Sequence, residues 1–122
     1  MKGAGTDIVS IARLGRSLAR GPAFAEEVFG DGERRYCEAQ RHPVQHYAAR
    51  FAAKEAFLKA VGVGILGGVA LRDIEVTREE AGSPRFELGP TAGAALERVG
   101  ATRSLVSLSH EGDYAIAFVV VL

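Results

Sequence analysis

The sequence predicts an α+β fold built as one small domain. Strand-like and helix-like segments follow each other in the order strand, helices, two strands, helix, two strands. This order is typical of helices packed on a mostly antiparallel sheet. The chain has 122 residues and contains no repeat, linker or low-complexity tract, and this length is enough for one hydrophobic core. We therefore expect residues 1–122 to form a single domain.

The composition favours a globular protein and gives no hint of nucleic-acid or membrane binding. Hydrophobic residues make up 48% of the chain, and 15 basic residues balance 15 acidic ones. The longest apolar run, residues 114–122, is too short to span a bilayer, and the N-terminal residues do not resemble a signal peptide. The one cysteine, Cys37, cannot form an internal disulfide or build a cysteine metal site, which indicates a reducing cytoplasm.

The first half of the chain is expected to hold one strand followed by four helices. Glycines and β-branched residues favour a strand over residues 3–11, and leucine spacing favours a helix over residues 12–20. Two short helical pieces are expected around residues 23–29 and 33–41. The strongest helix prediction covers residues 46–61, which are rich in alanine and precede a glycine suited to a C-terminal cap.

The second half is expected to hold two pairs of strands with a helix between them. Glycines over residues 62–68 predict a flexible loop, and residues 110–113 predict a hairpin turn. Alternation, turn residues and an early proline predict the remaining elements: strands over residues 70–77 and 85–88, a helix over residues 90–99, and strands over residues 104–109 and 114–121.

Polar side chains stand at three places where the pattern favours apolar ones: Asp7, Glu55 with Lys59, and His110 beside Ser109. Each has an ordinary explanation, because Asp7 could cap the following turn, Glu55 and Lys59 could form a surface pair, and His110 could be a solvated turn residue. Two carboxylates and a lysine also suit Mg²⁺ shared with phosphate oxygens. Spacing alone does not show that Asp7 and Glu55 meet.

Three segments together resemble the holo-[acyl-carrier-protein] synthase family, the small trimeric type of the 4'-phosphopantetheinyl transferase superfamily. They are residues 5–9 (GTDIV), 50–60 (RFAAKEAFLKA) and 107–110 (SLSH), of which the middle one is the most specific. The glycine-rich loop, the strand around residues 73–76 and the turn at residues 82–84 look like family features as well.

The resemblance implies transfer of 4'-phosphopantetheine from coenzyme A to a serine of an apo acyl carrier protein of fatty acid or polyketide synthesis. The reaction would depend on Mg²⁺ and release adenosine 3',5'-bisphosphate. The family also implies a cytoplasmic homotrimer with active sites between subunits, and we expect the apolar strand over residues 114–121 to lie in the subunit contact. The alternatives are a non-catalytic module that binds coenzyme A or a carrier protein, and a generic α+β domain with a chance motif.

Site residues follow from the same resemblance. Asp7 and Glu55 would bind Mg²⁺, Lys59 would lie beside the pyrophosphate, and Glu55 or a water on the metal would take the serine proton. The residues expected to bind the cofactor are Arg50, Lys59, Gly62, Gly64, Ser83, Pro84 and His110. The chain departs from the family pattern at Glu27, Ser83 and Glu111, which could change cofactor or partner affinity, and at Lys2 and Ala4, which could shorten the first strand.

Three arginines are expected to form a basic ridge on the first helix. Arg13, Arg16 and Arg20 are spaced i, i+3 and i+7, with Leu14 and Leu18 on the opposite side. Such a ridge is either a solvated face or a docking surface for an acidic carrier protein.

Overall fold

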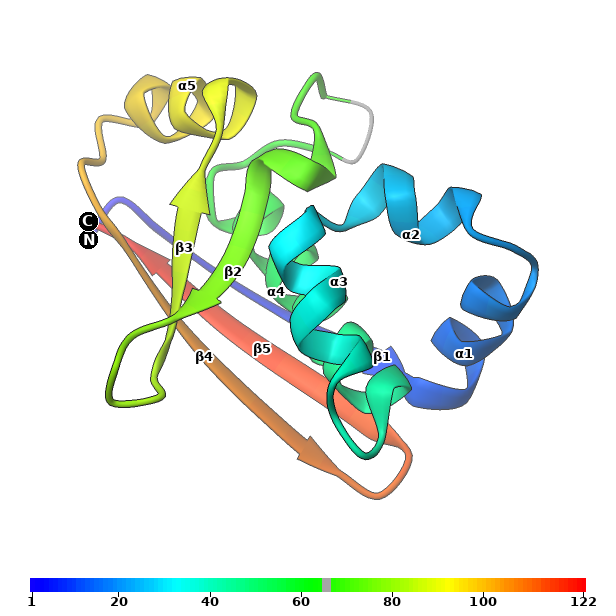
Figure 1. Cartoon of the computed structure of the whole chain (residues 1–122). Helices are drawn as coiled ribbons and strands as arrows, with labels where there is room; N and C mark the ends of the chain where they lie inside the picture. Colours follow the sequence, from blue (N-terminus) through cyan, green and yellow to red (C-terminus); the bar gives the residue numbers. More distant parts are fainter. Residues whose placement is uncertain (65–66) are drawn as a thin grey trace.

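The computed structural model, which describes residues 1–64 and 67–122, confirms the α+β class (Figure 1). Its elements follow the predicted order, with an added 3-10 turn, η1. They are β1 (Gly3–Ser10), α1 (Ile11–Ala19), α2 (Ala23–Val28), α3 (Asp31–Glu38), α4 (Pro43–Ala60), η1 (Leu71–Asp73), β2 (Ile74–Arg78), β3 (Pro84–Leu88), α5 (Pro90–Arg98), β4 (Ser104–Glu111) and β5 (Tyr114–Val121).

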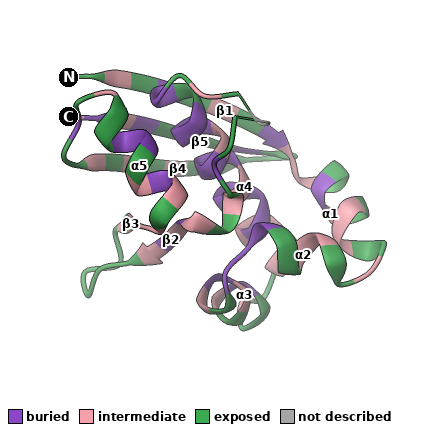
Figure 2. Ribbon diagram, turned by 90° about the horizontal axis from the view of Figure 1, so that it is seen from above, coloured by how far each residue is buried: buried purple, intermediate pink, exposed green. Residues whose placement is uncertain are grey.

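The strands form a three-stranded antiparallel sheet in the order β1-β5-β4 and a separate β2-β3 hairpin. In β5, buried side chains alternate with exposed or half-buried ones, because one face of this sheet packs on α4 (Figure 2). The buried set includes Ala115, Ala117 and Val119. The other face carries Ile116 and Phe118 and is exposed in the single chain.

Glycines let β1 pack unusually close to α4. A Cβ atom at Gly5 would overlap the carbonyl oxygen of Ala56, and one at Gly3 would overlap that of Ala60. Because only glycine lacks that atom, larger residues at these two positions would push the strand away from the helix. The close packing therefore brings the following residue on the same face of β1, Asp7, up to α4.

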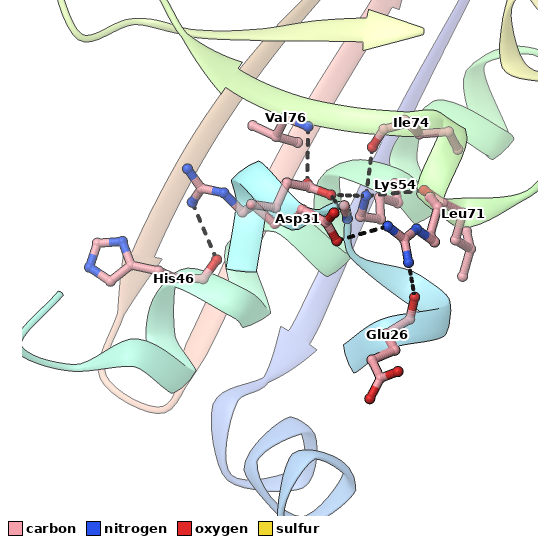
Figure 3. A network of polar contacts seen from close by, with 11 residues as sticks. Glu26, Asp31, His46, Lys54, Leu71, Ile74 and Val76 are labelled. Carbon is pink, nitrogen blue, oxygen red and sulfur yellow. Dashed lines mark hydrogen bonds and ion pairs between the residues drawn. The ribbon is translucent and has the colours of Figure 1, made fainter. Parts of the chain in front are cut away.

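A buried ion pair ties α3, α4 and β2 together (Figure 3). Lys54 Nζ donates to Glu33 Oε1 at 2.8 Å and to the carbonyl oxygens of Leu71 and Ile74. Glu33 also accepts from the backbone N–H groups of Gly30 and Val76. Both side chains are 0% exposed. These bonds offset part of the cost of burying the two charges, and burial still lowers the pKa of Lys54.

Three element predictions need correction. Helix α4 begins at Pro43 and not at residue 46, because proline is well accepted at the first helical position. The strand predicted over residues 70–77 begins only at Ile74, after η1. His110 lies within β4, and the turn of the β4-β5 hairpin is Gly112-Asp113, with Gly112 at a positive φ of 56°. No helix in the described part of the chain is long and apolar enough to cross a membrane.

Candidate active site

Asp7, Glu55 and Lys59 meet where β1 runs along α4. Lys59 Nζ lies 3.2 Å from Asp7 Oδ1 and donates to the carbonyl oxygen of Thr6 at 3.0 Å. The helix-capping role that Asp7 could have taken belongs to Ser10, whose side chain accepts from the N–H of Arg13. Lys59 therefore links α4 to β1, and its role is not limited to a surface ion pair with Glu55.

Glu55 is half-buried beside Asp7. Burial raises the pKa of its carboxyl, the negative charge of Asp7 raises the pKa further, and Lys59 lowers it. Its Oε1 atom is buried and has no hydrogen-bond partner among the described residues. A buried, unpaired carboxylate oxygen next to a second carboxylate is a suitable ligand pair for a divalent cation.

The ligand set fits Mg²⁺ better than a metal held by protein side chains alone. Within residues 1–64 and 67–122, no three His, Cys, Asp or Glu side chains are grouped so that they could hold a metal ion. Mg²⁺ is usually bound by one or two carboxylates, with water and substrate phosphate filling the octahedron. Asp7 and Glu55 supply that number of carboxylates, and Lys59 adds a positive charge for the phosphate.

Basic side chains line a second site, a cavity of about 130 Å³ between α4, β2 and β4. Its lining includes His46, Arg50, Arg78 and His110. His110 Nε2 lies 3.0 Å from Gln45 Nε2 on α4. Burial lowers the pKa of His46, and so do the nearby Arg50, Arg78, His110 and His42. This concentration of positive charge in a concave site is suited to phosphate.

Arg50 is the most deeply buried member of this cluster, at 1% exposure. Its guanidinium carbon lies 4.2 Å from the centroid of the Tyr36 ring. Its Nη1 donates only a long bond, 3.5 Å, to the carbonyl oxygen of His46, and its Nε has no partner among the described residues. A buried charge of this kind is stable only with a counterion or compensating dipoles, which an anionic ligand would supply.

The two groups of residues lie on different sides of α4. Arg50 and Glu55 are five residues apart in this helix, a rotation of roughly 140° about the axis. Among the residues that the structure describes, the predicted carboxylates and the predicted phosphate-binding residues of one chain therefore face different sides of this helix.

The remaining predicted cofactor residues lie at turns. Gly62, with φ of 72°, follows α4, and its N–H donates to the carbonyl oxygen of Lys59. Gly64 is exposed. Ser83 and Pro84 lie at the β2-β3 turn, where the Ser83 carbonyl accepts from Glu79. Ile65 and Leu66, part of the predicted glycine-rich loop, lie outside the described residues.

The predicted basic ridge is on the surface. Arg13 and Arg16 are exposed on α1, and exposed Arg20 directly follows its last residue. Leu14 is buried and Leu18 is half-buried, as the helical spacing predicted.

Sequence reasoning missed three residues of this basic cavity and its wall: Tyr36, His46 and Arg78. They lie on α3, α4 and β2, outside the three conspicuous motifs, and only the tertiary structure brings them together. One signal was available, since His46 precedes Arg50 by one helical turn and so lies on the same helix face.

Residues 3–119 match the family described as the 4'-phosphopantetheinyl transferase superfamily. The chain belongs to this superfamily. It is 45% identical over 121 residues to a holo-[acyl-carrier-protein] synthase of Syntrophotalea carbinolica, with 98% of this chain and 94% of that protein covered. It is 46% identical over 118 residues to the synthase of Moorella thermoacetica, with 97% and 91% covered.

Solved structures of such synthases share the fold. The structure from Neisseria meningitidis superimposes with a TM-score of 0.91 at 42% identity, covering 100% of this chain and 98% of that one. The Helicobacter pylori synthase, solved in complex with coenzyme A, gives a TM-score of 0.85 at 31% identity, covering 98% and 99%. The predicted family and fold class are thereby confirmed, and the chain is a phosphopantetheinyl transferase.

Proposed function

We propose that the chain transfers 4'-phosphopantetheine from coenzyme A to a serine of an apo acyl carrier protein, with Mg²⁺ as cofactor. The observation that carries this proposal is the unpaired, buried Oε1 of Glu55 beside Asp7 and Lys59. The names of the similar proteins, and the coenzyme A complex of the Helicobacter pylori synthase, agree with it.

The reaction replaces the pyrophosphate anhydride bond of coenzyme A with a phosphodiester bond to the serine. The serine Oγ attacks the β-phosphorus of coenzyme A, and the bond from that phosphorus to the bridging oxygen breaks, which releases adenosine 3',5'-bisphosphate. Mg²⁺ held by Asp7 and Glu55 would supply positive charge to the pyrophosphate oxygens. Lys59 stabilises the charge that grows on the transferring group and leaving group. Glu55, or a water on the metal that Glu55 orients, would accept the serine proton.

The basic residues of the cavity between α4, β2 and β4 bind the phosphates. Arg50 and His110 bind coenzyme A's phosphates, including the 3'-phosphate, with Ser83 and Pro84 alongside the nucleotide. Gly62 and Gly64 let the backbone after α4 approach the cofactor, as loops rich in glycine do.

A homotrimer with shared sites would combine the two clusters. The exposed face of the β1-β5-β4 sheet carries apolar side chains in register, with Ile8 paired to Ile116 and Thr6 to Phe118. Ile8 is 61% exposed and Phe118 is 50% exposed. Contiguous apolar side chains of this kind mark contact surfaces, and we propose that other copies of the chain cover them. The carboxylates of one subunit would then face the phosphate cluster of the next.

The carrier protein is proposed to dock on Arg13, Arg16 and Arg20, because acidic partners are attracted by an exposed row of guanidinium groups.

Residues 1–122 act as one domain, and Cys37, which is buried, favours a cytoplasmic protein.

A mass measurement tests the transfer directly. The protein is mixed with Mg²⁺, coenzyme A and an apo carrier protein, and the carrier should gain the mass of one phosphopantetheine group. A reaction with a chelator in place of Mg²⁺ is the control. Binding of coenzyme A without any gain of carrier mass would support the alternative, a non-catalytic binding module.

A further inference from the structure

Arg78, the last residue of β2, lines the same cavity as Arg50 and His110. Its guanidinium carbon lies 5.1 Å from the centroid of the Tyr36 ring, against 4.2 Å for Arg50. Two guanidinium groups from different elements therefore contact one aromatic ring, a favourable arrangement of cations and a π-system. Tyr36 also lies edge-on to the ring of His46, with centroids 5.8 Å apart.

The carboxylate closest to these charges by shared lining is Glu75, which lies outside the cavity in a neighbouring hollow that Tyr36, Arg50 and Arg78 also line. None of the described residues that line the cavity itself is a carboxylate, and neither Arg50 nor Arg78 takes part in an ion pair among the described residues. Arg50 is buried and its Nε has no partner in the described part of the chain. Like charges held this close to each other repel, so the arrangement is stabilised by an anion that both guanidinium groups can reach.

We propose that Arg78 is a further specificity-determining residue that binds the 3'-phosphate of coenzyme A together with Arg50 and His110. Tyr36 positions the two guanidinium groups. The proposal rests on the proposed function, since it names the part of coenzyme A that this cluster binds. A phosphate monoester offers three oxygens, and the planar guanidinium fork binds two of them at once.

The fold restricts how Arg78 can move. Its Nη1 donates to the carbonyl oxygen of Gly82 in the β2-β3 turn, and its plane contacts Tyr36. Tyr36 in turn lies on α3, which the buried Glu33–Lys54 pair fixes to α4. Arg78 is exposed, but these contacts reduce the side-chain entropy that it loses when the phosphate binds, which favours affinity.

The experiment compares coenzyme A with dephospho-coenzyme A, which lacks the 3'-phosphate. Dissociation constants are measured by calorimetry for the wild type, Arg78→Gln and Arg78→Lys, after circular dichroism has verified the fold of each. We expect Arg78→Gln to reduce the preference for coenzyme A about tenfold, the effect of losing one charge-assisted hydrogen bond. Arg78→Lys should reduce it less, because the charge remains and the fork is lost.

Two further changes separate this role from a general effect of charge. Arg85→Gln removes the same charge from an exposed position on β3, outside the cavity, and should leave the preference unchanged. Tyr36→Leu should weaken the preference and Tyr36→Phe should keep it, because only the first removes the ring.

An unchanged preference for coenzyme A in Arg78→Gln would overturn the proposal. An equal loss of affinity for coenzyme A and dephospho-coenzyme A would also overturn it, because Arg78 would then contact a part that the two ligands share. Binding needs no turnover, so this test is separate from that of the transfer reaction. If Arg78→Gln reduces the preference of a protein that transfers nothing, the inference about Arg78 is supported and the proposed transfer reaction is contradicted.

Discussion

Lys59 Nζ contacts Asp7 Oδ1 at 3.2 Å, although the two residues are 52 positions apart in the chain. The contact exists because glycine at positions 3 and 5 lets β1 approach the helix that carries Lys59. It also keeps the ammonium group beside the proposed metal ligands. The packing of β1 on α4 therefore determines where the Lys59 ammonium group and the Asp7 carboxylate lie. Substitutions of either side chain should affect catalysis more than folding.

Asp7→Asn and Glu55→Gln should each abolish Mg²⁺-dependent transfer while leaving the circular dichroism spectrum unchanged, because the amides keep the shape and lose the metal ligand. Glu55→Gln should also raise the melting temperature in a chelator, since a neutral amide costs less to bury than a carboxylate. Glu97→Gln, at an exposed position of α5, is the matched control. Wild-type turnover by either variant at saturating Mg²⁺ would contradict the metal assignment.

Lys59→Ala should lower kcat by at least about tenfold and change the KM for coenzyme A much less. The reason is that the ammonium group acts mainly on charge that develops in the transition state. Steady-state kinetics with varied coenzyme A measure both constants. A loss confined to KM would mean that Lys59 only binds the ground-state phosphate.

Mixed subunits should reveal whether the active site is shared. Preparations of Asp7→Ala and of His110→Ala are unfolded together and refolded. At a low concentration of coenzyme A the mixture should transfer faster than either variant alone, because some active sites then combine an intact Asp7 from one subunit with an intact His110 from the next. Light scattering of the wild type should give the mass of a trimer. Phe118→Glu should dissociate it, whereas Ala94→Glu on the exposed side of α5 should not. A monomeric wild type at micromolar concentration would rule out the shared site.

The pKa of His46 is lowered mainly by burial and then by Arg50, Arg78, His110 and His42. As the pH falls, His46 of the unfolded chain becomes protonated near its ordinary pKa of 6.5, whereas His46 of the folded protein becomes protonated only at a lower pH. The free energy of unfolding should therefore fall as the pH drops through 6.5 toward the lowered pKa. Denaturant unfolding between pH 5 and 7.5 should show a smaller pH dependence for His46→Gln. Equal slopes for the variant and the wild type would contradict the linkage.

Arg16→Glu should raise the KM for the carrier protein several-fold and leave the KM for coenzyme A nearly unchanged. Exposed charges mainly speed the encounter with an acidic partner, and salt screens them. The effect should accordingly shrink at higher ionic strength. Glu27→Arg, near the ridge in sequence, is expected to change the KM in the opposite direction. A wild-type KM that does not respond to salt would show that α1 is not the docking surface.

Sequence patterns located the helices well for two different reasons. Leucine spacing marked the buried side of α1. Alanine content and the glycine that follows marked α4, which is buried around most of its circumference. Sequence patterns also singled out Asp7 and Glu55, which are polar residues in apolar surroundings. Lys54 was missed because a lysine beside a glutamate in a helix has the composition of an exposed face. Its burial depends on Glu33 and on carbonyl oxygens from residues 71 and 74. No local pattern encodes a partner 21 positions away.

The Glu33–Lys54 pair should constrain which variants of this chain survive selection. Losing one partner leaves a buried charge alone and typically costs about 3–5 kcal/mol, whereas exchanging both for apolar residues is often neutral. In a library of single substitutions, nearly every change at either position should therefore be depleted. In a library of paired substitutions, matched apolar combinations such as Glu33→Leu with Lys54→Met should reappear among folded proteins. Enrichment of lone Lys54 variants would show that the pair is dispensable.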